Sequence, residues 1–530
     1  MIHVTVNEPD FEYDIHSLVK AFFPREDVVV LPEEDNAPAA AAEEAEAAGA
    51  AVKKPHIYGK SVKEYAARKQ AGTDPITLHL QVRYEGEYIS AYLKACKTDD
   101  ADAYERKKSV PVCYTDREDM AMRVDTKNRL KRLLYDQLSE YTGKALPWGT
   151  LTGIRPTKIP MKGLETGKSD EEILRGMKET YLISDEKAAL SLEIAKKERE
   201  ILKDLDYENG YSLYIGIPFC PTRCLYCSFT SYPIEKWKHR TGEYLDALEA
   251  EMTGVTPLFS GKKLQSIYIG GGTPTSLGPA DLERFLSMIE AHFSLTDVIE
   301  YTVEGGRPDS FTPEKLHVLR QHPVTRISVN PQTMNQKTLD LIGRCHTTEQ
   351  TIEAFYMARD AGFDNINMDL ILGLPGEDAG MVMHTLEEIQ KLKPDSLTVH
   401  SLALKRAARL REEFSDYVKY GMHNSDELMN LVRRTAAEIG LFPYYLYRQK
   451  NMAGNLENVG YAATKKEGIY NILIMEEKQT ILSLGAAGMT KFVMNGRPVR
   501  TENVKDVDQY IGRVDEMIER KKTKYYGIGM

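Results

Sequence analysis

The stretch from Ser212 to about Leu404 repeats a short apolar segment followed by a helical pattern, and this repetition limits the fold more than any other feature. Six β-rich segments occur in order: SLYIGI, SIYIG, EYTVE, RISVNP, NINMDLILG and SLTVHSLAL. Each of the first five is followed by a helical stretch, and strands that alternate with helices indicate parallel βαβ units. A closed barrel of this kind needs about eight units. We therefore predict an α/β fold built on an open, partial (β/α)6 barrel.

The flanking residues predict three further parts. We expect an α+β domain at 1–145, a helical connector at 146–210, the barrel at 211–405, and a mixed cap or substrate domain at 406–530. The first part contains a strand in IHVTV, a helix in EYDIHSLVKAFF and a β-hairpin in ITLHLQVRYEGEYISAYLKA. Near residues 32–54 it also contains an Ala/Glu-rich stretch without an apolar stripe, which is typical of a surface insertion.

Composition excludes several classes of protein. A net charge of −10 over 530 residues argues against a broad basic surface for nucleic acid. No apolar run approaches the roughly 18 residues that span a bilayer. The first residues, MIHVTVNEPDFEYDI, lack the basic start and apolar run of a secretory signal, so we expect no membrane span and a cytoplasmic location. Six cysteines are too few for a disulfide scaffold in a chain of this length.

Three of those cysteines, Cys220, Cys224 and Cys227, follow the first predicted barrel strand in YIGIPFCPTRCLYCSF. Thiolates are the usual ligands of iron–sulfur clusters. The C-x3-C-x2-C spacing can hold three irons of a cubane [4Fe–4S] cluster, and the open fourth iron can chelate the amino and carboxylate groups of S-adenosylmethionine (SAM). Two alternatives remain: a structural zinc site, for which His239 is the nearest fourth ligand, and three buried cysteines without a ligand.

Glycines and polar residues lie near the carboxyl ends of the next strands, where such barrels carry their chemistry. GGGTPT, residues 270–275, follows the second strand. Its glycines let the backbone approach a ligand and expose N–H groups, which is compatible with a site for the methionine amino group of SAM. Glu304, Gln332 and Asp369 lie at or near later strand ends, and Arg344 follows. A carboxylate can bind ribose hydroxyls and an arginine can pair with a carboxylate, although each residue alone is also typical of an ordinary strand end.

These motifs, in this order, resemble the radical SAM family of oxygen-independent coproporphyrinogen III oxidases, and within it the HemZ-type (coproporphyrinogen dehydrogenase) branch. The resemblance extends from Tyr214 to about Leu410, and LPWGTLTGIRPTKI and YYLYRQKNMAGNLENVGYA extend it more loosely. It implies a [4Fe–4S] cluster on Cys220, Cys224 and Cys227, and one or two bound SAM molecules. The positions that match SAM-contacting residues of the family are Tyr214, Tyr226, Gly271, Gly272, Thr273, Glu304, Gln332, Arg344, Asp369 and, through its backbone, Ala403.

The resemblance further implies oxidative decarboxylation of coproporphyrinogen III to protoporphyrinogen IX by a 5′-deoxyadenosyl radical, with an electron donor such as flavodoxin or ferredoxin. The carboxylates of a porphyrinogen need cationic partners. The basic candidates near predicted loops are Arg307, Lys405, Arg406, Arg448 and Lys450. Arg155 and Lys158 lie in the Pro/Gly-rich ALPWGTLTGIRPTKIP, which is either a connector loop or a second source of cations for an anionic ligand.

Three departures from the family pattern leave the substrate open. Gly216 stands where the family usually has histidine, and Gly305-Gly306-Arg307 replaces a shorter linker before Pro308. Ser228-Phe229 follows the last cysteine, as in the haem-chaperone branch. Two other functions therefore stay open: haem binding or delivery without decarboxylation, and anaerobic modification of haem by radical chemistry.

Overall fold

The structure is a computed structural model that divides into two compact units. The first comprises Met1–Ile154 and Gly167–Ala189, and the second comprises Arg155–Thr166 and Leu190–Met530. The residues that the structure describes are 1–8, 10–24, 26–33, 77–95, 104–112, 119–153, 155–403, 405, 408–412, 420–421, 423–449, 452, 455–494 and 496–529. Most of the predicted Ala/Glu-rich insertion, together with Arg406 and Lys450, lies outside these residues.

The first unit contains a five-stranded sheet in its described part, with the order β2-β1-β3-β4-β5. Its strands are β1 (Ile2–Val6), β2 (Val28–Pro32), β3 (Leu78–Glu85), β4 (Tyr88–Ala95) and β5 (Glu105–Pro111). Every second residue of β1 is buried, and its apolar side chains share a core with α1 (Glu12–Phe22) and α4 (Met120–Thr142). The structure thus has the predicted strand, helix and hairpin.

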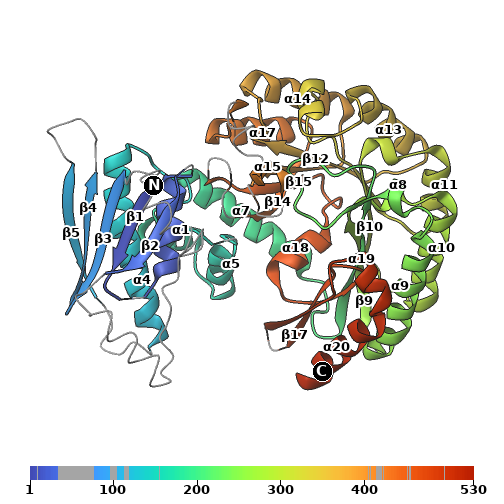
Figure 1. Cartoon of the computed structure of the whole chain (residues 1–530), viewed down its shortest axis with the longest axis horizontal. Helices are drawn as coiled ribbons and strands as arrows, with labels where there is room; N and C mark the ends of the chain where they lie inside the picture. The colour runs from blue at the N-terminus through green and yellow to red at the C-terminus, as the bar shows by residue number, and fades with distance from the viewer. Residues whose placement is uncertain are drawn as a thin grey trace. The chain divides into compact units, whose positions relative to one another are not determined.

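The second unit is built on a curved sheet, in which six parallel strands lie side by side in chain order. They are β6 (Gly210–Ile217), β9 (Lys263–Gly271), β10 (Glu300–Gly306), β11 (Arg326–Val329), β12 (Ile366–Leu372) and β13 (Ser396–Ser401). The longer helices between them are α9 (Thr241–Val255), α10 (Pro279–His292), α11 (Pro313–Gln321), α13 (Thr348–Asp360) and α14 (Ala379–Leu392). They follow the outside of the sheet in Figure 1, and the predicted partial (β/α)6 barrel is confirmed.

The two faces of the barrel strands differ in chemistry because side chains alternate along a strand. Leu213, Ile267 and Val303 are fully buried on the helix-covered face. The residues between them face inward and are polar or aromatic: Tyr214 pairs in register with Tyr268, and Glu304 with Ser328. The inside of the barrel therefore presents hydrogen-bonding groups.

The described strands of the C-terminal residues belong to the barrel sheet. At one edge of the barrel sheet, β15 (Asn458–Ala462) pairs antiparallel with β13, and β14 (Phe442–Tyr447) pairs with β15. At the other edge, β16 (Thr480–Leu484) pairs parallel with β6, and β17 (Met489–Met494) and β18 (Arg497–Glu502) continue the sheet. The predicted cap is thus an extension of the barrel sheet, and the division of the chain into four domains stays a prediction.

Helices connect and cover these strands. The predicted helical connector contains α5 (Lys158–Glu165), α6 (Asp170–Tyr181) and α7 (Asp185–Leu202). The C-terminal residues add α17 (Asp426–Glu438), α18 (Ile469–Glu476), α19 (Val507–Gly512) and α20 (Val514–Gly527). Among the described residues, none of the helices is both long enough and apolar enough to cross a membrane.

Candidate active site

The three cysteines lie in one loop that leaves the carboxyl end of β6. Cys220 ends the short strand β7 (Phe219–Cys220), and the amide of Cys227 donates to the carbonyl of Cys224 at 3.2 Å. The Leu225 amide donates to the Ile342 carbonyl at 2.9 Å, which fixes the loop against the chain that leads to Arg344. Burial raises the pKa of the Cys220 thiol to about 11 and also raises that of Cys227. Metal binding must therefore displace protons from these thiols.

The three thiols suit the predicted cluster through their chemistry. Thiolates are the usual ligands of iron–sulfur clusters, and a cubane binds each thiolate to a different iron. Within the described residues, no three His, Cys, Asp or Glu side chains are grouped closely enough to hold one ion.

The glycine loop after β9 packs directly against the cysteine loop. A Cβ atom on Gly272 would lie 2.6 Å from the Phe219 carbonyl oxygen and 3.0 Å from the Cys220 sulfur. The amides of Gly272 and Thr273 donate to Ile217 and Phe219 at 2.8 and 2.7 Å. The amides of Gly272 and Thr273 are thus paired with the cysteine loop, and contact between these two residues and SAM stays a prediction. Their N–H groups hold the two loops together.

Glu304 lies inside the barrel among three tyrosines. The Tyr268 hydroxyl donates to Glu304 Oε1, and the Tyr268 ring stacks on those of Tyr214 and Tyr470, with centroids 6.2 and 4.5 Å away. Burial, with the nearby Asp369 carboxylate, raises the pKa of Glu304 to about 7. Neither Tyr268 nor Tyr470 was predicted. Side chains alternate along the strands, so Tyr268, the register partner of Tyr214, also faces inward. Tyr470 lies on helix α18, whose sequence gives no sign that it faces the same space.

Arg344 and Tyr226 are in direct contact. The Arg344 guanidinium donates to the Tyr226 hydroxyl at 2.9 Å and to the Asn330 carbonyl at 2.6 Å. Burial raises the pKa of the Tyr226 phenol above its usual range. The arginine thus joins the cysteine loop, which carries Tyr226, to the end of β11.

Gln332 and Asp369 also lie next to each other. The Gln332 amide donates to the Asp369 carbonyl at 2.9 Å, and the Ile371 amide donates to the Gln332 carbonyl at 3.0 Å. Gln332 has a φ of +68°, which turns its backbone to form this bridge to β12. The Asp369 carboxylate accepts from the side-chain amide of Asn367 at 2.7 Å. Ala403, the last predicted site residue, forms a backbone bridge with Met452.

Several buried polar atoms near these residues have no hydrogen-bond partner within the described structure. They are Ser328 Oγ, Asn330 Oδ1, Gln332 Oε1 and Arg344 Nε. Buried polar groups in folded proteins are normally paired, so such a group of acceptors and a donor fits a polar ligand. An amino acid joined to a nucleoside, as in SAM, offers the matching ammonium, carboxylate and hydroxyl groups.

The predicted basic residues differ in their availability. Arg307 is buried and pairs with Asp309 at 2.5 Å, and Arg448 donates to Asn455 at 2.8 Å. The Lys405 ammonium instead lies over the Phe229 ring, 5.4 Å from its centroid, and the ring is 62% exposed. Arg155 pairs with Glu477 at 2.6 Å, which favours the connector-loop interpretation of its segment.

The structure adds one loop that was not predicted from the sequence. Gly485 to Gly488 follow β16, directly beside the carboxyl end of β6. A Cβ atom on Gly485 would lie 2.5 Å from the Gly216 carbonyl oxygen, and the Tyr244 hydroxyl donates to that oxygen at 2.6 Å. The glycines in LGAAG after an apolar run could have indicated it.

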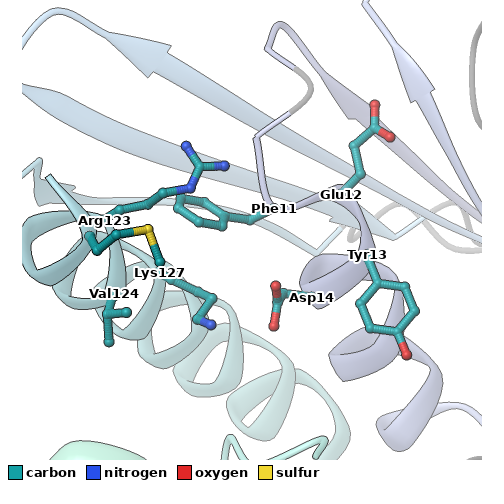
Figure 2. Close-up of a pocket in the computed structure, with 8 residues that line it drawn as sticks. Phe11, Glu12, Tyr13, Asp14, Arg123, Val124 and Lys127 are labelled. Carbon is teal, nitrogen blue, oxygen red and sulfur yellow. The ribbon is translucent and has the colours of Figure 1, made fainter. Parts of the chain in front are cut away.

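The first unit has a cavity of about 330 Å³ between α1 and α4, lined in part by Phe11, Glu12, Asp14 and Lys127 (Figure 2). Arg123 pairs with Asp10 at 3.0 Å and lies over the Phe11 ring. Asp14 lies 3.7 Å from Lys131. These charges are already paired, so the cavity gives no indication of a function.

Six parallel βα units, with a three-cysteine loop after the first strand, define a radical SAM protein. A family model described as the radical SAM superfamily matches residues 214–389. The oxygen-independent coproporphyrinogen-III oxidase-like protein HemZ of Bacillus subtilis is 42% identical over 401 residues, which is 74% of this chain and 80% of that protein. The chain therefore belongs to the HemZ-like family of radical SAM proteins, and its cofactors are a [4Fe–4S] cluster and SAM.

Other relatives match shorter parts of the chain. The haem chaperone HemW of B. subtilis is 37% identical over 195 residues, 37% of this chain and 51% of that protein. The oxygen-independent coproporphyrinogen III oxidase of Escherichia coli is 27% identical over 314 residues, 58% of this chain and 66% of that protein. The solved structure of the E. coli oxidase HemN is similar with a TM-score of 0.48 and 25% identity, over 59% of this chain and 70% of that one.

Proposed function

We propose that the protein decarboxylates coproporphyrinogen III oxidatively to protoporphyrinogen IX without oxygen. The observation that carries this proposal is the extent of the similarity to HemZ. The similarity covers 401 residues, about twice the length that matches the haem chaperone, and therefore includes the flanks of the barrel. The name of that relative describes it as similar to a coproporphyrinogen oxidase.

In this proposal Cys220, Cys224 and Cys227 hold the cluster through their thiolates. When bound, the cluster and SAM supply a carbon radical that can remove hydrogen from an unactivated C–H bond. Glu304 binds ribose hydroxyls, and Arg344 pairs with a methionyl carboxylate. The remaining contacts to SAM come from Tyr214, Tyr226, Gly271, Gly272, Thr273, Gln332, Asp369 and Ala403.

Lys405 and Phe229 support a substrate that has both a ring and carboxylates. Lys405 lies near Cys227, and burial lowers the pKa of its ammonium while the Cys227 charge opposes this shift. An ammonium above an exposed aromatic ring can pair with a carboxylate at the edge of a ligand while the ring contacts its apolar face. We therefore propose that Lys405 binds a propionate and that Phe229 contacts a pyrrole ring.

The proposed reaction balances over each of two rounds. Each round would consume one electron and one SAM, and the products would be methionine and 5′-deoxyadenosine, which would carry one hydrogen taken from the propionate β-carbon. The bond between the propionate α-carbon and its carboxyl carbon then breaks, which leaves a vinyl group and releases CO2 and one electron. An external donor supplies the first electron, and an external acceptor takes the last.

The test is an anaerobic assay of the reconstituted protein with SAM, a reductant, an electron acceptor and coproporphyrinogen III, with products followed by mass. Stepwise loss of two CO2 units is expected, and Cys224→Ala should abolish it. Cys345→Ala is the matched control, because Cys345 is exposed and lies outside the three-cysteine motif. Cleavage of SAM with unchanged coproporphyrinogen would exclude this substrate.

A second candidate is a protein that binds or delivers haem. The haem chaperones of B. subtilis and Lactococcus lactis are 37% and 38% identical over about 195 residues, against 27% for the E. coli oxidase over a longer match. Ser228-Phe229, after the last cysteine of the motif, also resembles the haem-chaperone branch. Stoichiometric haem binding without porphyrinogen turnover would support this function. Consumption of haem together with SAM would instead indicate a haem-modifying enzyme.

The partners follow from the same proposal. A donor such as flavodoxin or ferredoxin would deliver electrons to the cluster, and the porphyrinogen is the small-molecule substrate. A cytoplasmic location is part of the proposal, since the electron donors and the oxygen-labile cluster require a reducing compartment.

A further inference from the structure

Four polar residues occur at every second position along β11 and the chain that follows it: Arg326, Ser328, Asn330 and Gln332. Ser328 pairs in register with Glu304 on one side and with Asn367 on the other. Partners in register on neighbouring strands point to the same face of a sheet. Glu304 and Asn367 face the inside of the barrel, so Ser328 does as well.

Asn330 is the third residue of this row, and both of its backbone hydrogen-bonding groups are already paired. Its amide donates to the Gly306 carbonyl at 2.9 Å, and its carbonyl accepts from the Arg344 guanidinium at 2.6 Å. The side-chain oxygen Oδ1 is buried and has no donor within the described residues. Ser328 Oγ is buried in the same way.

Leaving such groups unpaired is costly. A buried polar atom without a partner destabilises a folded protein, and a leucine or alanine at these positions would avoid that cost. Ser328 is the register partner of Glu304, and the Asn330 carbonyl accepts from Arg344; Glu304 and Arg344 both belong to the proposed SAM site. Because Asn330 Oδ1 is a hydrogen-bond acceptor, the missing partner must carry an N–H or O–H group.

We propose that Asn330 Oδ1 accepts a hydrogen bond from SAM, through its ammonium or a ribose hydroxyl, and that Ser328 Oγ makes a second hydrogen bond to the same molecule. This inference rests on the proposed SAM site but not on the identity of the tetrapyrrole. Asn330 is a binding residue in this assignment, and the ligand-free protein keeps it unpaired at the expense of stability.

The test measures SAM binding and stability in the same variants. Asn330→Ala in the anaerobic, cluster-loaded full-length protein should raise the Kd for SAM about tenfold, measured by equilibrium dialysis without tetrapyrrole. Its melting temperature without SAM should equal or exceed that of the wild type, because the unpaired atom is gone. Ser328→Ala should change both quantities in the same direction.

Asn367→Ala is the matched control. Asn367 also faces inward, but its Oδ1 already accepts from Ser396 and Thr398, each at 3.1 Å. This variant should lower the melting temperature of the SAM-free protein. A similar drop in Asn330→Ala, with an unchanged Kd for SAM, would mean that Asn330 is structural and would overturn the proposal.

Two further outcomes also contradict it. If Asn330→Ala leaves the Kd for SAM unchanged but raises the Kd for coproporphyrinogen III, Asn330 Oδ1 accepts its hydrogen bond from a pyrrole N–H of the substrate and not from SAM. An absence of SAM binding in the cluster-loaded wild type would overturn the inference together with the site. Failure of decarboxylation alone leaves both binding measurements intact, so it can be told apart from failure of this inference.

Discussion

Glu304 is an inward-facing carboxyl whose protonation depends on its surroundings. Burial and the Asp369 charge raise its pKa to about 7, while the donors Tyr268 and Gly271 oppose that rise. The group is thus half-protonated near neutral pH in the ligand-free protein. A ribose hydroxyl donates to the ionised form of a carboxylate, so ligand binding and proton release at Glu304 should be linked.

Glu304→Gln should change the pH dependence of stability. The pKa is about 7 in the folded protein against 4.5 in the unfolded chain. The folded state therefore binds more protons between these values, and the free energy of unfolding should fall as pH rises through this range, by on the order of 2 kcal/mol. The variant should lack this component. Urea unfolding at pH 5 and pH 8 measures this change in the free energy of unfolding. The same change in the wild type and in Glu304→Gln would contradict a raised pKa of Glu304.

Gly272→Ala should impair cluster assembly. The added Cβ would meet the Phe219 carbonyl oxygen at 2.6 Å and the Cys220 sulfur at 3.0 Å, closer than atoms tolerate, so the cysteine loop must shift. Iron content and the charge-transfer absorption of the reconstituted protein should drop severalfold. Gly278→Ala, at an open position six residues on, is the control. Full iron content in Gly272→Ala would contradict the close packing of the loops.

Helix α20 is attached to the barrel by a buried ion pair. Lys521 contacts Glu251 of α9 at 2.6 Å, and both side chains are at most 1% exposed. Glu251 also accepts from Tyr510 at 2.6 Å and from Asn503 at 2.8 Å. These contacts join α9, α19 and the segment after β18. The attachment of the C-terminal helices to the barrel therefore depends on one carboxylate, that of Glu251.

Lys521→Ala should destabilise this part of the molecule strongly. Removing one partner of a buried pair leaves the other charge uncompensated and costs about 3–5 kcal/mol. Lys522→Ala is the matched control, since Lys522 pairs with Glu519 at the surface and such a pair contributes about 0–1 kcal/mol. Chemical denaturation of both variants measures the difference. Equal midpoints would mean that the pair does not hold α20.

At the scale of elements, the sequence predicted what local periodicity determines. Short β-rich segments followed by helical patterns identified the six barrel strands, and the spacing of cysteines identified their loop. Periodicity does not say which sheet a strand joins, and so the places of β15 and β16 at opposite edges were not predicted. The same limit explains why Tyr470 was missed, because its position beside Tyr268 depends on how α18 packs.

At the scale of the whole molecule, the chain passes between its two units three times. Residues 155–166, which include α5, belong to the second unit, whereas residues 167–189, which include α6, belong to the first. No composition change marks these passages, so the sequence predicted one continuous connector. In the first unit, Ile173 and Met177 of α6 are buried, and α6 contacts α4.

This interleaving predicts how the protein tolerates truncation. A fragment of residues 146–530 keeps α6 but lacks α4, so Ile173 and Met177 become exposed and the fragment should bind an apolar dye and aggregate. A fragment of residues 155–530, in which residues 167–189 are replaced by a Gly/Ser linker of equal length, keeps the second unit without that surface. It should stay monodisperse and still take up iron. Light scattering and iron analysis compare the two fragments. If both behave alike, α6 does not depend on the first unit.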